Sequence, residues 1–207
     1  MQENIYKNLG AAQIDVLAEI GNIGSGNAAT ALSTMLNTSI SIQTPTVKIM
    51  DINKAADMLG GPENVVVGIL SVMQGDVEGM MLFLLESEFA CKTLNVLLGS
   101  DYKDFNSIDE MGQSALIEIA NIMAYSYANA LAALTDFFIS LTVPSMCYDM
   151  LGAVLSEPSI VFAEVGDQLM FIKGDMNVAG ENMKSHMLMI PEAKSLQKIM
   201  EKLGVQG

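Results

Sequence analysis

The chain repeats part of its own sequence at an offset of 99 residues. When residues 11–45 are laid on residues 110–144 without a gap, eleven of the 35 positions are identical. Similarity at a fixed offset indicates a duplicated structural unit. Because a length of 207 residues suits one large domain or two small fused halves, we predict a single domain over residues 1–207. We expect it to consist of two repeats, about 10–100 and 107–204.

Both halves show the same succession of patterns. Apolar residues at helical spacing run through residues 10–36 and again through 107–135. A segment rich in β-branched residues follows each, SISIQTPTVKIM and FISLTVPSMC, whose proline confines it to a sheet edge or a strand end. Two further strands flank a turn in each half: VVVGILSVM and GMMLFLLE, then QLMFIKGDMNV and KSHMLMI. The closing helices, SEFACKTLNVLLG and AKSLQKIMEKLG, end in a glycine placed for a C-cap.

These patterns predict an α/β fold of the α+β kind with two layers. One layer is an antiparallel sheet, and the other contains the two long equivalent helices packed alongside it. The duplication predicts that a pseudo-two-fold axis relates the halves.

The charge and hydropathy of the chain exclude several classes of protein. Asp and Glu number 24 against 10 Lys and Arg, so nucleic acid and anionic membrane would be repelled. No run of 18 apolar residues exists, which argues against insertion into a membrane. The start, MQENIYKNLG, has no basic region followed by an apolar one, so it does not resemble a secretory signal. We therefore expect a soluble, cytoplasmic protein.

Residues that commonly carry catalysis are scarce. Two cysteines, Cys91 and Cys147, form no disulfide framework in a chain of this length, and we predict both to be buried. The single histidine, His186, stands beside an apolar strand, where a structural role is more common than a catalytic one. No cluster of His, Cys and carboxylate ligands predicts a metal site, and no nucleophile elbow accompanies the histidine.

The stretch EIGNIGSGNAATAL, residues 19–32, places three glycines inside a predicted helix. A dinucleotide-binding loop would need a strand before the glycines, but a helix precedes them here. In the second repeat Ala120, Met123 and Tyr125 stand at the three glycine positions, so glycine is not the repeated feature. We predict that the glycines allow another helix or a partner to approach closely.

The feature that both repeats keep is polar. An Asp or Ser, then Glu, then Asn recur at spacings of four and three, with a proline 23 residues after each asparagine: Asp15, Glu19, Asn22 and Pro45, then Ser114, Glu118, Asn121 and Pro144. These spacings place the three polar side chains of each repeat on one helical face. A merely solvated stripe is the alternative, but it explains one copy better than two.

This doubled pattern resembles the CheC/CheX/FliY phosphatases of bacterial and archaeal chemotaxis. The segments EIGNIGSGNAATA, GDVEGMMLF, ALIEIANIMAYSYANALAAL, VPSMCYDMLGAVLSE and HMLMIP carry the resemblance in order, over nearly the whole chain. It implies a hydrolase whose substrate is the phosphorylated response regulator CheY. It also implies that the protein has no cofactor or metal of its own, because the regulator supplies the magnesium.

The resemblance assigns roles to the polar residues. Asn22 and Asn121 would each orient a water in line with the phosphate, while Glu19 and Glu118 would contact the regulator's active-site lysine. Asp15 and Ser114 would tune or support the same faces. A rival interpretation is a module that binds phosphorylated CheY without hydrolysis, as flagellar switch proteins related to this family do.

A second partner implied by the resemblance is CheD, the receptor deamidase. The stretch YDMLGAVLSEPSIVFAEVGD predicts a helix that begins near residue 150, with Asp149 as a plausible cap. It is either an extra core helix or a surface helix that docks on CheD through Asp149 and Met150. We expect a monomer or a heterodimer with CheD.

Overall fold

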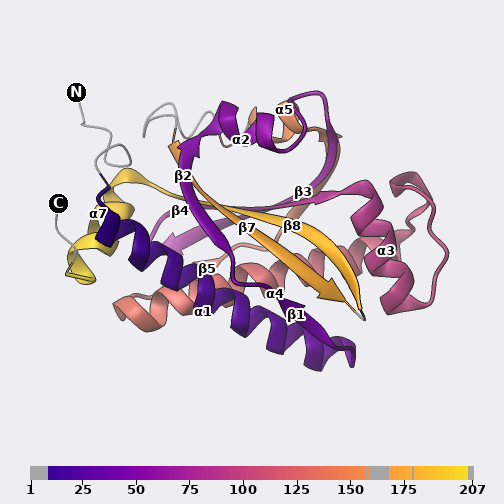
Figure 1. Ribbon diagram of the computed structural model, residues 1–207, viewed down its shortest axis with the longest axis horizontal. Helices are drawn as coiled ribbons and strands as arrows, with labels where there is room; N and C mark the ends of the chain where they lie inside the picture. The colour runs from indigo at the N-terminus through magenta and orange to yellow at the C-terminus, as the bar shows by residue number, and fades with distance from the viewer. Residues whose placement is uncertain (1–8, 157, 159–167, 179, 205–207) are drawn as a thin grey trace.

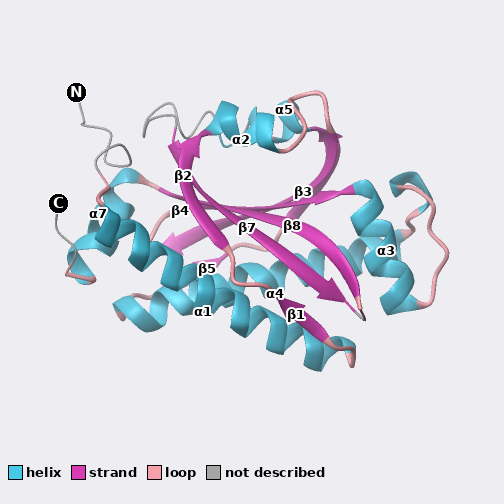
Figure 2. Cartoon of the chain, viewed as in Figure 1, coloured by secondary structure: helices cyan, strands magenta, loops and turns pink. Residues whose placement is uncertain are grey.

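The computed structural model describes residues 9–156, 158, 168–178 and 180–204. Figure 2 shows long helices on one side of a twisted sheet and short helices on the other. The helices are α1 (Ala11–Leu36), α2 (Ile52–Met58), α3 (Ser87–Leu98), the 3₁₀ turn η2 (Phe105–Ser107), α4 (Glu110–Thr135), α5 (Leu151–Val154) and α7 (Ala193–Lys202). The strands are β1 (Ile40–Ile42), β2 (Thr46–Asp51), β3 (Val65–Gly75), β4 (Gly79–Glu86), β5 (Ile139–Leu141), β6 (Ser145–Met150), β7 (Gln168–Val178) and β8 (Glu181–Pro191).

Element bounds recur at the offset found in the sequence. Helix α4 begins and ends 99 residues after α1, and β5 and β6 stand at the same offset from β1 and β2. Both long helices end on a left-handed residue, Asn37 with φ 46° and Asp136 with φ 58°. Asn and Asp tolerate this conformation better than most residues do, which explains why two non-glycine residues close these helices.

The strands form one eight-stranded sheet in which every pairing is antiparallel, as predicted. The order is β1-β7-β8-β4-β3-β5, with β2 also paired to β7 and β6 to β3. The strands of the two repeats interleave in this order: β1 and β2 pair with β7, β5 and β6 pair with β3, and β4 pairs with β8, where Leu82 lies opposite Leu188. The backbone ladder therefore runs without interruption from one repeat into the other.

Helices cover both faces of the sheet (Figure 1). Helices α1 and α4 pack on one face in opposite chain directions, and α2 and α5 lie on the other. Strand β4 shows the division, because Met81, Phe83 and Leu85 join the larger core while Leu82 and Leu84 join the smaller one. Burying one such side chain contributes about 1.5–3 kcal/mol. The predicted sheet and long helices are present, and the short helices add a layer that the sequence patterns did not predict.

The long helices touch closely where the glycine-rich stretch faces α4. A Cβ atom built on Gly24 would lie 2.5 Å from Cδ1 and 3.0 Å from Cα of Tyr127. The Tyr127 hydroxyl lies 2.7 Å from Ser25 Oγ, which donates to the Gly21 carbonyl at 2.8 Å. Burial raises the pKa of Tyr127, so the hydroxyl stays protonated and can donate. The prediction that glycines permit close approach of a helix is confirmed at Gly24, whereas Gly26 has nothing within 4 Å of its Cβ position.

Helix α4 is held at its start by a side-chain cap. The Asp109 carboxylate accepts from the Gly112 amide at 2.9 Å and from the Tyr102 hydroxyl at 2.6 Å. These hydrogen bonds, that from Tyr102 first, lower the pKa of Asp109. The stabilisation from this cap is therefore present above the usual pKa of an aspartate and is lost as the pH falls.

Two expectations about single residues need correction. Cys91 is buried, but Cys147 is exposed, because β6 turns Met146 and Tyr148 toward the core and Cys147 toward the opposite face. Asp149 is not a helix cap: Met150 holds the N-cap position of α5, and no side chain caps that helix. The part of the predicted helical stretch at residues 157 and 159–167 lies outside the described residues.

The segment after β6 has a buried side and an exposed side. Leu151, Val154 and Leu155 are buried in the smaller core, as expected of a core helix. Met150 is 49% exposed, and Asp149 is exposed beside it. No described helix is long and apolar enough to cross a membrane.

The contact at Gly24 predicts opposite effects for two alanine substitutions in one helix. Gly24→Ala should lower the free energy of unfolding by about 1–3 kcal/mol, since its methyl would overlap the Tyr127 ring and backbone. The matched control Gly26→Ala should raise it by about 0.5–1 kcal/mol, because only the helix propensity changes there. Urea unfolding of both variants measures the difference. Equal stability of the two would contradict the helix contact described here.

Candidate functional site

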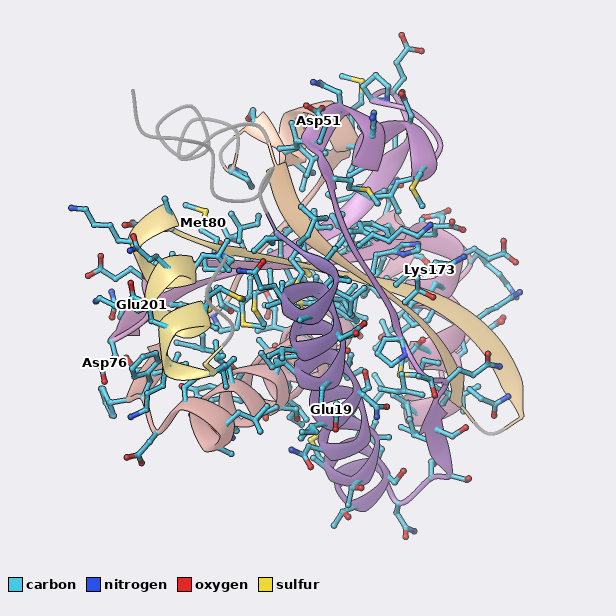
Figure 3. All side chains as sticks on the ribbon, turned by 60° about the vertical axis from the view of Figure 1, so that its left-hand side comes forward. Glu19, Asp51, Asp76, Met80, Lys173 and Glu201 are labelled. Carbon is cyan, nitrogen blue, oxygen red and sulfur yellow. The ribbon has the colours of Figure 1, made fainter. Side chains whose placement is uncertain are left out.

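The repeated polar residues lie on the outer faces of the two long helices. Asp15, Glu19 and Asn22 are exposed on α1, and Figure 3 shows Glu19 on the exposed side of that helix. Leu17 and Ile20, between them in sequence, are buried against the sheet. The helical repeat therefore separates a packing face from a polar face on α1.

Helix α4 repeats this arrangement with one difference. Ser114 and Glu118 are exposed, while Asn121 is half-buried. Leu116 and Ile119 take the buried positions. The structure thus brings the three predicted polar residues of each repeat together on a single helix face.

The polar side chains of both faces are available to an outside partner. Within the part of the chain that the structure describes, the side chains of Glu19, Asn22, Glu118 and Asn121 form no hydrogen bond or ion pair. The two ion pairs among these described residues, Lys92 with Glu88 and Lys103 with Asp101, lie elsewhere. An exposed carboxylate and carboxamide without partners can bind a cation and orient a water molecule, but they supply no strong nucleophile.

The proline of the motif supports the helix that carries the polar face. Pro45 is buried, and its Cγ atom lies 3.6 Å from the position of a Cβ on Gly21. Val47 Cγ2 lies 2.9 Å from the same position. Gly21 precedes Asn22, so the absence of a side chain there lets the loop before β2 pack directly behind the polar face. This gives a second glycine of the stretch a packing role.

Sequence reasoning missed two exposed apolar residues of the second repeat, one beside the polar face and one in a loop. Tyr125 is 38% exposed and stands one helical turn after Asn121. Val143, in the loop between β5 and β6, is 89% exposed. The available signal was the helical spacing of Tyr125 from Glu118 and Asn121, which places it on the same side of α4.

Among the described residues, side chains that commonly bind metals are not grouped on either polar face. Among them, no group of three or more His, Cys, Asp or Glu side chains is arranged to hold a metal ion. A cavity of about 560 Å³ is lined in part by Lys173, His186 and Glu86. His186 is buried there in β8 and stacks on Phe171 with ring centroids 5.5 Å apart. None of the predicted Glu or Asn residues lines this cavity.

The sequence and the structure are similar to the same group of known proteins. The model of the CheC-like family matches residues 13–49 and 111–148, which contain both polar motifs. CheY-P phosphatase CheC of Bacillus subtilis (strain 168) is 33% identical over 207 residues, covering 97% of this chain and 98% of that protein. Flagellar motor switch phosphatase FliY of the same organism is 32% identical over 138 residues, covering 66% of this chain and 36% of that protein. The crystal structure of Thermotoga maritima FliY superposes with a TM-score of 0.74 at 24% identity, covering 96% of this chain and all of that one.

The exposure of the two polar faces predicts that they add little to stability. Glu19→Ala and Glu118→Ala should each change the free energy of unfolding by less than about 0.5 kcal/mol, because neither carboxylate has a partner to lose. Leu17→Ala, on the opposite side of α1, should lower it by about 2–5 kcal/mol. Chemical denaturation of the three variants makes the comparison. A cost above about 1 kcal/mol for either glutamate would show that its face is packed or paired.

Proposed function

This chain belongs to the CheC-like family, and on that premise we propose that it is a chemotaxis phosphatase that hydrolyses the aspartyl phosphate of the response regulator CheY. One observation carries the proposal: each long helix presents a Glu and an Asn on an exposed face, and their side chains have no partner among the described residues. A protein substrate needs such a face, since its phosphorylated surface cannot enter a closed cavity.

The chemistry asks little of this chain beyond positioning. Phosphoryl transfer depends chiefly on an in-line nucleophile and on stabilisation of charge around the phosphate. We assign Asn22 and Asn121 to the orientation of the attacking water, because a carboxamide can accept from the water and donate toward the phosphate. Rigid helices hold both amides, so little ordering remains when the substrate binds.

The two glutamates set the register of the complex. We assign Glu19 and Glu118 to a charge-assisted hydrogen bond with the regulator's active-site lysine. Each glutamate lies three residues before its asparagine on the same face, so an anchored lysine fixes where the amide reaches. Asp15 and Ser114, one turn earlier, tune or support these faces and take no part in bond cleavage.

Metal chemistry belongs to the regulator in this scheme. The phosphorylated regulator brings its own magnesium, which neutralises the phosphate oxygens. This chain therefore acts without a cofactor or a metal of its own, and we expect it to work in the cytoplasm as a monomer or bound to CheD.

We further propose that CheD binds at the start of α5. Leu151 and Val154 are buried, so they hold the segment against the sheet from behind. Asp149 and the half-exposed Met150 then form a charged and an apolar contact on the outside. An apolar anchor with a charged neighbour suits a protein interface.

The rival function is binding of phosphorylated CheY without hydrolysis. The fold alone does not separate the two functions, because proteins with the same fold can differ in activity. The doubled Glu–Asn pair favours catalysis, and release of phosphate from phosphorylated CheY, with and without this protein, distinguishes them.

Two equivalent motifs predict partial redundancy. Asn22→Ala or Asn121→Ala alone should leave part of the phosphatase activity, since the other amide still orients a water. The double variant should lose at least about a hundredfold in rate, the scale of a lost positioning group. Its binding to phosphorylated CheY should persist through the glutamates. Phosphate release and equilibrium binding together make the test, and full activity in the double variant would refute the mechanism.

The CheD contact predicts an effect that is separate from catalysis. Asp149→Lys should weaken CheD binding by about tenfold or more, because it reverses a charge within the interface. Phosphatase activity without CheD should be unchanged, since Asp149 lies outside both Glu–Asn faces. Glu78→Lys, in the turn between β3 and β4, is a matched charge reversal that should leave CheD binding intact. CheD affinity of wild-type strength in the Asp149 variant would remove this residue from the interface.

A further inference from the structure

The two Glu–Asn faces differ in what stands next to them. One turn after Asn121 the helix carries Tyr125, whereas the position one turn after Asn22 is Gly26. In the loops that follow, Val143 of the second repeat corresponds to Thr44 of the first. The second repeat therefore has an aromatic and an aliphatic residue where the first has a glycine and a threonine.

The Tyr125 side chain is restrained by one long hydrogen bond. Its hydroxyl donates to the Leu141 carbonyl at 3.4 Å, which ties the ring to the end of β5. The ring remains 38% exposed. A tyrosine that is already ordered loses little side-chain entropy on binding, which is why tyrosine is common among residues that dominate interfaces.

The loop that carries Val143 is also fixed. Thr142 exchanges two hydrogen bonds of 3.0 Å with Val72 of β3, one through its amide and one through its side-chain oxygen. Pro144 restricts Val143 to an extended conformation. Val143 is thus held outward, 89% exposed, two residues beyond the carbonyl that holds Tyr125.

The corresponding surface of the first repeat is open and polar. A Cβ on Gly26 would have no atom within 4 Å, and Thr44 is exposed. The first face also carries Asp15 where the second has Ser114, so it presents one more negative charge to an approaching phosphate. Both differences weaken docking of a phosphorylated partner at the first face.

We propose that Tyr125, together with Val143, is a docking surface for the phosphorylated response regulator and makes the second Glu–Asn face the tighter-binding of the two. This inference rests on the proposed function, and it goes further by assigning unequal affinities to two motifs that the sequence presents as equivalent. Tyr125 takes no part in the chemical step. It lowers the dissociation constant, and through it KM, while kcat at the second face stays the same.

The test measures binding at one face at a time. A lysine in place of either glutamate repels the regulator's lysine. Glu118→Lys therefore leaves only the first face able to bind, and Glu19→Lys leaves only the second. The probe is CheY activated with beryllofluoride, an analogue of the phosphoryl group that cannot be hydrolysed. We expect the Glu19→Lys protein to bind this probe about tenfold more tightly than the Glu118→Lys protein.

Substitutions at Tyr125 and Gly26 then test whether the tyrosine causes this difference in affinity. Tyr125→Ala in the Glu19→Lys protein should weaken binding about tenfold, and Tyr125→Phe, which keeps the ring and loses only the hydrogen bond to Leu141, should weaken it less than about threefold. Gly26→Tyr in the Glu118→Lys protein should tighten binding at the first face, since that position is open. In the Asn22→Ala protein, adding Tyr125→Ala should raise the KM of phosphate release without lowering kcat.

The outcomes separate this inference from the proposed function. Affinity of the Tyr125→Ala variant within about twofold of its parent overturns the docking role. The docking role is also overturned if Tyr125→Ala lowers the thermal unfolding midpoint together with the affinity and Gly26→Tyr does not tighten binding. Tyr125 would then have a structural role. Absence of phosphate release by the wild-type protein would refute catalysis, while the beryllofluoride titrations would still decide whether Tyr125 docks the regulator.

Discussion

The contact between Tyr127 and the backbone at Gly24 sets how closely the two long helices approach. A methyl group on Gly24 would overlap the tyrosine ring, and the tyrosine hydroxyl is held by Ser25 at 2.7 Å. Because close-packed interiors transmit small displacements, the separation of α1 and α4 fixes how each helix lies on the sheet. The direction in which each polar face points depends on that packing.

The contact between the two long helices is not strictly symmetric. At the 99-residue offset, Gly24 corresponds to Met123 and Tyr127 to Ala28, so a small and a large residue have exchanged sides. All four are buried. Such an exchange conserves volume across the interface while the two halves diverge, which is the kind of change that cores tolerate best.

Packing and function occupy opposite sides of the same helices. Leu17 and Leu116 bury their side chains in the larger core, while the side chains of Glu19 and Glu118 form no hydrogen bond or ion pair with the residues that the structure describes. A helix held from its apolar side can present polar groups in a fixed orientation, as positioning of a water requires. The outer faces are therefore free to diverge. One such divergence is Tyr125, at the position that corresponds to Gly26.

The sequence by itself determined the repeat, the long helices, the antiparallel strands and the spacing that unites each Glu with its Asn, because periodicity and turn residues are local properties. Only the tertiary structure decided what the glycines do: Gly24 meets α4, Gly21 meets a strand loop, and Gly26 meets nothing. It also decided that Cys147 is exposed and that a second layer of short helices covers the sheet. Those outcomes depend on which residues distant in sequence come to lie opposite one another, and no local pattern carries that information.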